Sequence, residues 1–437
     1  MEWTLVLLQR LGQAVVGLLL NPFYYISLLI VVWQMHRQIY FERKCYHSRI
    51  HYLFRETWRI ALWGLLAGAT LSLAMGAVGA SIMPQTILYL WLGVLLLALI
   101  RVRFLCFAYI IGLLGAIHAI ITQVPFVSAN LQSLPAADRW LSPLTHIHMP
   151  SLLLLVGLLH LAEALLIRVQ GERLAMPVFI QGKRGKIVGS YQFQGLWPVP
   201  LLMLVPATHG SSAGQAPWLF DPLFGGADMW SGGWMFMALP MMIGFSDMTV
   251  SRTPRQKAKE SATRLLIYGA LLTLAAVVSE LWHFFILPAS LLAVILHEVM
   301  IWLARREEDN RSPLYVHSQR GLRVLAVLPN SAAQSIGIQP GELIHKVNGK
   351  LVRSKEELHQ AIQLNAAFTR LEIIDLRGEH RFAQRALFEG EHHQLGIILA
   401  PDDDAEYYVI PKKINKFRKL RSSLARQSRT SEQTVTE

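Results

Sequence analysis

GLRVLAVLPNSAAQSIGIQPGELIHKVNGKLV, residues 321–352, is the stretch that decides the fold of the C-terminal part of this chain. Short runs of aliphatic residues alternate here with Pro, Gly and Asn-Gly, a pattern typical of strands joined by tight turns. A helix is predicted over 354–364, because Ser354 is a good N-cap and Glu356 and Glu357 suit the positive end of the helix dipole. Further strands are predicted over 371–376, 381–387 and 395–399. The pattern predicts a small α+β domain built as a partly open barrel.

The sequence that precedes this domain has the composition of a membrane protein. Of the 437 residues, 53% are apolar and only 16% are charged. Several apolar stretches reach the roughly 20 residues that a helix needs to cross about 30 Å of hydrocarbon. We predict eight to ten membrane segments, with short or proline-containing ones tilted, kinked or re-entrant. The stretches are 3–20 (which could instead lie in the interface or form half of a hairpin), 23–33, 60–82, 86–100, 104–121, 151–167, 196–206, 234–245, 265–278 and 281–304.

Basic residues are distributed unevenly over the connections between these stretches. One set of connections carries 18 Lys and Arg residues, whereas the intervening set carries one, Arg139. Lys and Arg are retained on the cytoplasmic side of a membrane. The basic connections, and everything after Arg305-Arg306, are therefore predicted to be cytoplasmic.

The predicted organisation is an α-helical polytopic transmembrane domain over 1–304, a linker over 305–313, a cytoplasmic α+β domain over 314–401 and a tail over 402–437. The tail carries eight basic residues and no acid between 412 and 429. It is predicted to be disordered, and either rests on anionic lipid or stays solvated. The net charge of +12 is spread between apolar runs, which disfavours nucleic-acid binding.

The two cysteines, Cys45 and Cys106, cannot form a disulfide framework or a four-ligand zinc site. No cofactor, metal site or catalytic residue is predicted. A zinc-dependent intramembrane protease would need HExxH, and the nearest match, His297-Glu298, has Ile301 where the second histidine should stand.

Ionisable residues nevertheless fall in or beside the apolar stretches, where they are costly and are functional candidates by default. The pairs His160/Glu163 and Glu280/His283 are each one helical turn apart. Interfacial placement or interhelical hydrogen bonding is favoured over a metal or proton site. The full set is His118, His160, Glu163, Glu280, His283, His297 and Glu298.

The C-terminal domain resembles bacterial PDZ domains. The resemblance covers 314–401, with Ile336 where the family usually has a small residue and Glu342 where it usually has Asp. It implies a circularly permuted α+β fold that binds an extended peptide beside a free strand. The residues that carry it are Val324, Val327, the run Pro329-Asn330-Ser331-Ala332-Ala333, Gly337, Pro340-Gly341-Glu342, Ile344 and Val347-Asn348-Gly349.

The PDZ resemblance also implies a peptide-binding groove with two walls. Its carboxylate-binding loop would be Gln394, Leu395, Gly396 and Ile397, which is similar to the family's Gly-Leu-Gly-Phe-type turn. Lys355, His359 and Ile362 share one helical stripe and would line the opposite wall. The alternative is that His359 is a solvated helix residue and Leu395 a core residue.

The whole chain resembles the MinJ family of division-site topology proteins from rod-shaped Gram-positive bacteria. The resemblance rests on the polytopic region, the basic first cytoplasmic loop, the single C-terminal PDZ domain and the stretch from Asn21-Pro22-Phe23-Tyr24-Tyr25 through Glu42-Arg43-Lys44. It implies a non-enzymatic scaffold at the cell membrane, enriched at septum and poles, that links DivIVA to MinC/MinD.

Two other functions stay open from the sequence. One is a PDZ membrane regulator that captures C-terminal peptides of other proteins. The other is a transporter or intramembrane metalloenzyme built on His160, His283 and His297.

Overall fold

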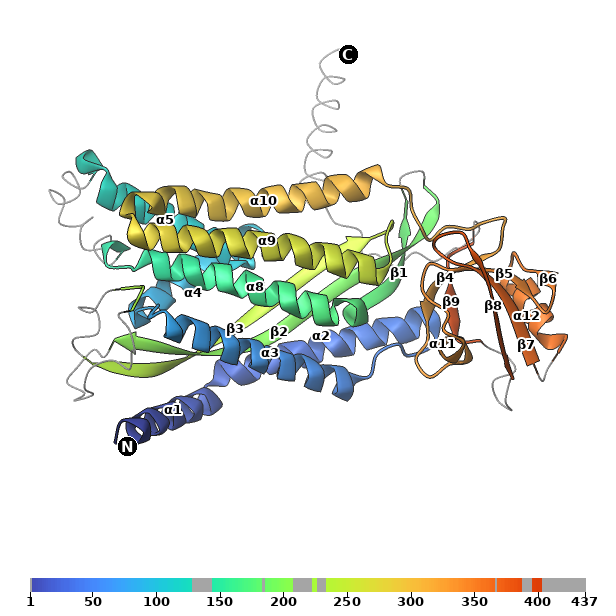
Figure 1. The fold of residues 1–437 in the computed structure, drawn as a ribbon, viewed down its shortest axis with the longest axis horizontal. Coiled ribbons are helices and arrows are strands. Elements are labelled where there is room, and N and C mark those ends of the chain that lie inside the picture. The colour runs from blue at the N-terminus through green and yellow to red at the C-terminus, as the bar shows by residue number, and fades with distance from the viewer. Residues whose placement is uncertain are drawn as a thin grey trace, which may run out of the picture.

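The computed structural model describes residues 2–127, 144–182, 185–206, 222–225, 233–365, 368–386 and 395–402. Helices run side by side along the long axis of the molecule, and a small β-rich domain lies at one end (Figure 1). The predicted combination of a helical membrane domain with a C-terminal α+β domain is confirmed.

The membrane domain is built mainly from long apolar helices. Within the described residues, four are long and apolar enough to cross a membrane, namely α3 (Leu53–Ala77), α8 (Met149–Leu174), α9 (Pro254–Leu281) and the continuous pair η3 (His283–Phe285) and α10 (Ile286–Asn310). A fifth candidate is the pair α1 (Glu2–Leu20) and α2 (Pro22–Tyr46), bent by 53°. Two shorter apolar helices, α4 (Pro84–Ile100) and α5 (Phe107–Gln123), are joined by η1 (Val102–Leu105).

The bend between α1 and α2 follows from Asn21-Pro22. The Asn21 side chain accepts a hydrogen bond from Phe23 N at 3.0 Å and caps α2. Pro22 has no N–H to continue α1 and suits the first position of the next helix. The first apolar stretch is therefore one arm of a bent helix pair.

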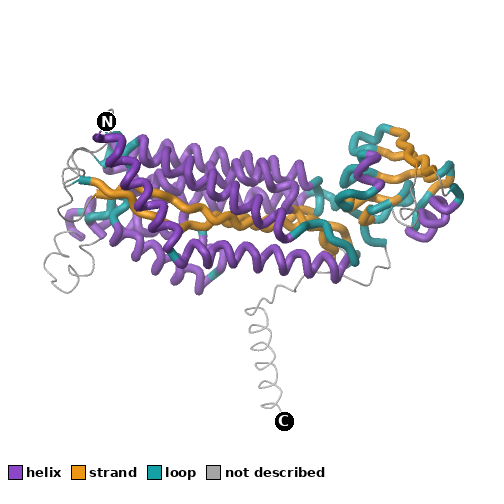
Figure 2. The backbone as a smooth tube through the Cα atoms, turned by 90° about the horizontal axis from the view of Figure 1, so that it is seen from below, coloured by secondary structure: helices purple, strands orange, loops and turns teal. Residues whose placement is uncertain are grey.

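Two of the stretches predicted as membrane segments, 196–206 and 234–245, are strands and not helices. They belong to an antiparallel sheet of β1 (Ala175–Gln181), β2 (Ile187–Pro206) and β3 (Trp234–Thr249), in that order. Figure 2 shows the strands running lengthwise among the helices. Strands β2 and β3 take the place of two of the helices counted from the sequence. The total number of membrane segments stays a prediction.

Prolines explain why these apolar residues form strands. Pro198, Pro200 and Pro240 would each break the interior of a helix. Pro200 pairs with Pro240 across the sheet. Since neither has an N–H, this must be a non-hydrogen-bonded pair, so the missing donors point away from the shared ladder and cost it nothing.

Helix α3 packs closely against the outer edge of β2. A Cβ atom on Gly64 would lie 2.1 Å from Pro198 O, and one on Gly68 would lie 2.3 Å from Pro200 O. Further along the same helix face, Ser72 Oγ accepts a hydrogen bond from Leu202 N at 2.8 Å. The glycines let the helix approach the strand, and the serine satisfies an edge N–H that would otherwise face apolar surroundings.

The hairpin and the helices span similar distances. Residues 194–206 of β2, beyond its pairing with β1, extend about 43 Å, and the 26 residues of α8 extend about 39 Å. One strand thus carries the chain to the far end and the other returns it. The alternation of basic and non-basic connections therefore fits the structure, although two of the crossing segments are strands.

The C-terminal domain has a sheet in the order β8-β7-β5-β4-β9, with β6 beside β5. All pairings are antiparallel. Leu358, Ala361 and Ile362 bury one face of helix α12 in the core of the domain. The elements are β4 (Leu322–Val327), α11 (Ala332–Ile336), β5 (Leu343–Val347), β6 (Lys350–Leu351), α12 (Lys355–Gln363), β7 (Phe368–Ile374), β8 (His380–Ala386) and β9 (Ile397–Leu399).

The predicted linker over 305–313 is helical as far as Asn310, where α10 ends. Glu308 holds this extension, because its carboxylate accepts hydrogen bonds from Val250 N at 2.7 Å and Ser251 N at 2.9 Å. Leu314 N then donates to Val250 O at 2.8 Å. The connection is therefore fixed to the end of β3.

The two domains pack against one another. Gly189 N of β2 donates to Tyr315 O at 2.8 Å, and Tyr315 is fully buried. The hydroxyl of Tyr191 donates to Leu325 O of β4. Ala326 and Ile398 of the C-terminal domain share a hydrophobic cluster with residues of the membrane domain. The small domain is thus docked on the membrane domain.

Candidate functional site

The predicted carboxylate-binding loop lies directly before β9 and is anchored at two points. Leu395 O accepts from Ala333 N, and Gly396 O accepts from Leu328 N, both at 2.8 Å. Gly396 has φ +74, and a Cβ there would lie 2.2 Å from Ser331 Cβ. Only glycine fits this position, for reasons of both backbone conformation and space.

Strand β9 ends the sheet and offers an edge for an added strand. It pairs with β4 through Val324↔Leu399, Ala326↔Ile398 and Val327↔Ile397, and no other described strand pairs with it. Although β9 comes last in the chain, it lies beside β4 near the start of the domain, which is the arrangement expected of a circularly permuted PDZ domain. An extended peptide could continue the sheet through the other edge of β9.

The residues predicted on the helical wall are not equivalent. Lys355 and His359 are exposed, and His359 Nε2 lies 3.0 Å from Gln363 Nε2. Ile362 is buried and shares the domain core with Leu395. The structure thus brings Leu395 and Ile362 together, but as core residues, and leaves Lys355 and His359 at the surface. Ile397 is half-buried at the start of β9, and Gln394 lies outside the described residues.

Helix α12, which carries this wall, is held at its start and along its length. Ser354 accepts a hydrogen bond from Glu357 N, and hydrogen bonds from the backbone N–H of Glu356 and from the Ser354 hydroxyl lower the pKa of Glu356. Asn348 Nδ2 donates to Ala361 O at 2.9 Å, while Asn348 Oδ1 accepts from Arg370 N at 2.9 Å. The Asn-Gly turn therefore ties the helix to the sheet, a role that the turn signal did not reveal.

Both departures from the usual PDZ pattern have a structural explanation. Glu342 pairs with Arg381 of β8 through contacts of 2.7 and 3.1 Å, and also accepts from Gln339 N at 2.9 Å. The longer side chain thus reaches a strand that is distant in sequence. Ile336 packs at the margin of the domain core.

Ser331, which the sequence placed in the PDZ pattern but not in the predicted groove, contacts the predicted carboxylate-binding loop. It caps α11 by accepting from Gln334 N at 3.2 Å, and its side chain abuts Gly396. A serine before a short helix is a capping signal. Its contact with the loop could not be seen, because the two positions are far apart in the chain.

The ionisable residues of the membrane domain have partners that differ from some predicted pairs. Glu280 contacts His148 Nε2 at 3.3 Å and accepts from Gly225 N at 3.0 Å. His283 instead accepts, through its carbonyl, a hydrogen bond from Gln123. The predicted pairing of Glu280 with His283 is therefore replaced by contacts between distant segments.

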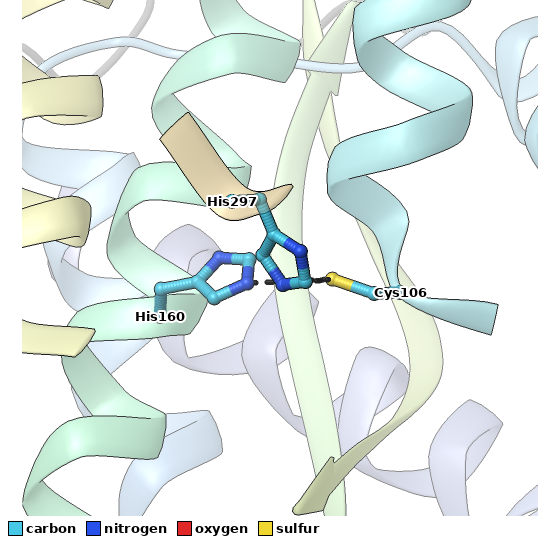
Figure 3. Close-up of side chains that lie close together, drawn as sticks. All are labelled: Cys106, His160 and His297. Carbon is cyan, nitrogen blue, oxygen red and sulfur yellow. Dashed lines mark hydrogen bonds between the residues drawn. The ribbon is translucent and has the colours of Figure 1, made fainter. Parts of the chain in front are cut away.

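The predicted neighbours His160 and Glu163 do approach one another, with 4.0 Å between His160 Nε2 and Glu163 Oε2. His160 also meets two side chains that the sequence did not place with it. Cys106, which precedes α5, converges with His160 of α8 and His297 of α10 (Figure 3). The ligand atoms of these three residues all lie within 4.8 Å of one another.

Comparison with known proteins agrees with this architecture. The PDZ domain family model matches residues 323–374. The chain is 29% identical over 408 residues to the cell division topological determinant MinJ of Bacillus subtilis, covering 92% of this chain and 97% of that protein. It is 28% identical over 414 residues to the probable cell division topological determinant MinJ of Lacticaseibacillus paracasei, covering 90% of this chain and 99% of that protein.

The fold defines a membrane protein with several apolar helices and a PDZ domain docked on its end. The similarity extends over both domains, so the whole chain is similar to the cell division topological determinant MinJ.

Proposed function

We propose that this MinJ-like protein is a non-enzymatic membrane scaffold that positions cell-division proteins through its cytoplasmic loops and its PDZ domain. The observation that carries the proposal is the similarity to MinJ over 92% of this chain and 97% of the relative, which includes both the membrane and the PDZ domain. The protein lies in the bacterial cell membrane with the PDZ domain in the cytoplasm, and is enriched at the septum and the poles. It links a DivIVA-like polar scaffold to MinD and MinC.

Two structural features support a scaffold. The PDZ domain offers the edge of β9 for a peptide, and its docking on β2 fixes the direction in which this edge faces. A rigidly mounted binding site holds a partner in a defined orientation relative to the membrane, and ordering it costs little entropy on binding.

The experiment that tests this function is localisation of the full chain as a fluorescent fusion in a rod-shaped Gram-positive host that lacks its own MinJ. We expect fluorescence at septa and poles, restored inhibition of polar division, and uniform membrane fluorescence once DivIVA is deleted. Localisation that does not change when DivIVA is removed contradicts the proposed link.

A second function, capture of protein C-termini by the PDZ groove, is favoured by the free edge of β9 next to the loop at Gly396. The full chain in detergent should bind peptides with a free C-terminal carboxylate more tightly than amidated ones. His359→Ala should change peptide preference, because His359 is exposed on the helical wall. Arg377→Ala, in the exposed β7–β8 turn, serves as the control.

Gly396 is not a suitable probe of peptide binding. Any larger residue would collide with Ser331 and force a side chain into a left-handed backbone conformation. Loss of binding in such a variant would report a damaged loop and not an occupied pocket. Equal binding of carboxylate and amidated peptides by the unaltered protein argues against this second function.

A further inference from the structure

The convergence of Cys106, His160 and His297 is unusual because the three residues come from distant parts of the chain and meet inside the membrane domain. Cys106 Sγ lies 3.4 Å from His160 Nε2 and 3.6 Å from His297 Nε2. His160 and His297 are 4% and 8% exposed. Figure 3 shows both imidazole rings directed toward the thiol.

Hydrogen bonds to the other ring nitrogens set the tautomers of both histidines. His160 Nδ1 lies 2.8 Å from Val156 O, which can only accept, so this nitrogen carries the proton. His297 Nδ1 lies 3.1 Å from the Tyr109 hydroxyl, and that hydroxyl donates its own proton to Glu298 at 2.6 Å. His297 Nδ1 is therefore also the donor. Both Nε2 atoms consequently present lone pairs to Cys106.

Hydrogen bonds among these three side chains cannot satisfy both Nε2 acceptors. The Cys106 thiol has one proton and can donate to only one imidazole, so the other Nε2 lone pair would face the thiol without a donor. A buried acceptor without a partner costs about 1–3 kcal/mol. Two imidazoles oriented by hydrogen bonds to their Nδ1 atoms, and a thiol between them, are instead what a metal ion requires.

The separations of the donor atoms match those of a tetrahedral zinc site. With Zn–S at about 2.3 Å and Zn–N at about 2.05 Å, the tetrahedral angle places sulfur and nitrogen about 3.6 Å apart. The two Sγ–Nε2 distances are 3.4 and 3.6 Å. An ion at the centre of the cluster would thus need little movement of the side chains.

The charge of a zinc site can be balanced at this position. Zn²⁺ binds a thiolate, so the Cys106 proton is released on binding. Glu163 Oε2 lies 4.0 Å from His160 Nε2 and can supply a second negative charge, either as a fourth ligand or through water. One thiolate, one carboxylate and two neutral imidazoles leave no net charge on the complex, which limits the cost of burying it.

We propose that Cys106, His160 and His297, with Glu163 beside them, bind one Zn²⁺ ion that links the start of α5 to α8 and α10. His160 and His297 each stand eight residues before a basic residue near a helix end, Arg168 and Arg305, or about 12 Å along the helix. The ion therefore lies between the helices, beside the ion pair of Arg103 and Glu298. It stabilises the packing of three helices and adds no reaction to the proposed scaffold.

Metal analysis of the full chain, purified in detergent with Zn²⁺ supplied and then dialysed, tests the site. We expect about one zinc ion per chain in the unaltered protein and loss of this zinc in Cys106→Ser and His297→Ala. Cys45→Ser and His283→Ala are matched controls that should retain zinc, because neither residue contributes to the cluster. Equal zinc content in Cys106→Ser and the unaltered protein overturns the proposal, as does an unaltered protein without zinc.

A second measurement does not depend on the folding of the ligand variants. In the Cys45→Ser protein Cys106 is the only thiol. Co²⁺ bound at the proposed site must therefore show a thiolate-to-cobalt charge-transfer band, and added Zn²⁺ should abolish it. Co²⁺ binding without this band, or no Co²⁺ binding at all, contradicts the site, whatever the outcome of the localisation experiment.

Discussion

His51 shows how one buried side chain can make the stability of the fold depend on pH. Its ring contacts the Glu42 carboxylate through Nδ1 and Arg173 O through Nε2. Burial alone would lower the pKa of His51. The hydrogen bond and charge of Glu42, aided by Arg173 O, outweigh burial and raise the pKa above its ordinary value.

Since the folded state binds this proton more tightly than the unfolded state, the stabilisation is complete below the unfolded pKa of about 6.5. It is lost as the pH rises through the higher folded pKa. We expect the apparent melting temperature of the full chain in detergent to fall over this range. His51→Gln should make the melting temperature depend less on pH.

A matched control for this prediction is His47→Asn. His47 is exposed and has φ 51, a left-handed conformation that Asn tolerates. This variant should keep the pH profile of the unaltered protein. An unchanged profile in His51→Gln would show that other groups cause the dependence.

Arg252 is the most heavily paired cation among the described residues and lies between β3 and α9. Its guanidinium is 3% exposed and contacts Glu260 at 2.6 Å, Glu307 at 2.8 Å and Glu308 at 3.2 Å. Removing one member of a buried ion pair costs about 3–5 kcal/mol. Because the partner carboxylates are partly exposed, we expect Arg252→Ala to lower the free energy of unfolding by roughly 2–3 kcal/mol.

The effect of Arg252→Ala should appear as a lower melting temperature and faster proteolysis after α10. Arg255→Ala, at an exposed arginine in the first turn of α9, is the control and should behave like the unaltered protein. Equal stability of the two variants would show that the Arg252 network contributes little.

At the scale of elements, the contact between α3 and β2 depends on glycine. A Cβ on Gly68 would lie 2.3 Å from the carbonyl oxygen of Pro200, so either the helix or the strand must move. Overpacking of this kind costs about 1–3 kcal/mol. We expect Gly68→Ala to reduce the melting temperature and the yield of monodisperse protein.

Gly76 in the same helix provides the comparison. A Cβ there would lie 3.7 Å from Leu204 Cδ1, which is ordinary van der Waals contact. Gly76→Ala should leave stability unchanged or raise it by up to about 1 kcal/mol, because alanine favours helix. If Gly68→Ala and Gly76→Ala have the same stability, α3 does not approach β2 as closely as the structure indicates.

At the scale of the whole molecule, the β2–β3 hairpin should carry the chain across the membrane and back. In a Cys45→Ser background, which retains half-buried Cys106, Leu223→Cys should react with a membrane-impermeant maleimide added to intact cells, since Leu223 is exposed near the far end. Glu379→Cys, in the PDZ domain, should react only after lysis. Labelling of Glu379→Cys from outside would overturn the cytoplasmic placement.

Hydrophobicity predicted the long helices but could not distinguish a membrane helix from a strand enclosed by helices. Residues 196–206 and 234–245 are apolar without a period that separates the two structures. The decisive signal was present in Pro198, Pro200 and Pro240, which are compatible with a non-hydrogen-bonded strand pair and not with a helix interior. From the sequence alone, Pro198 and Pro200 predict a tilted, kinked or re-entrant segment.

The sequence by itself determined the membrane domain, the distribution of basic loops and the PDZ fold, because composition, turn residues and helix caps act locally along the chain. Only the tertiary structure decided which distant residues meet. Cys106 is 54 residues from His160 and 191 from His297, and β9 pairs with β4 although the other elements of the domain lie between them in the sequence. No local pattern encodes such contacts, because they arise when whole helices and strands pack together.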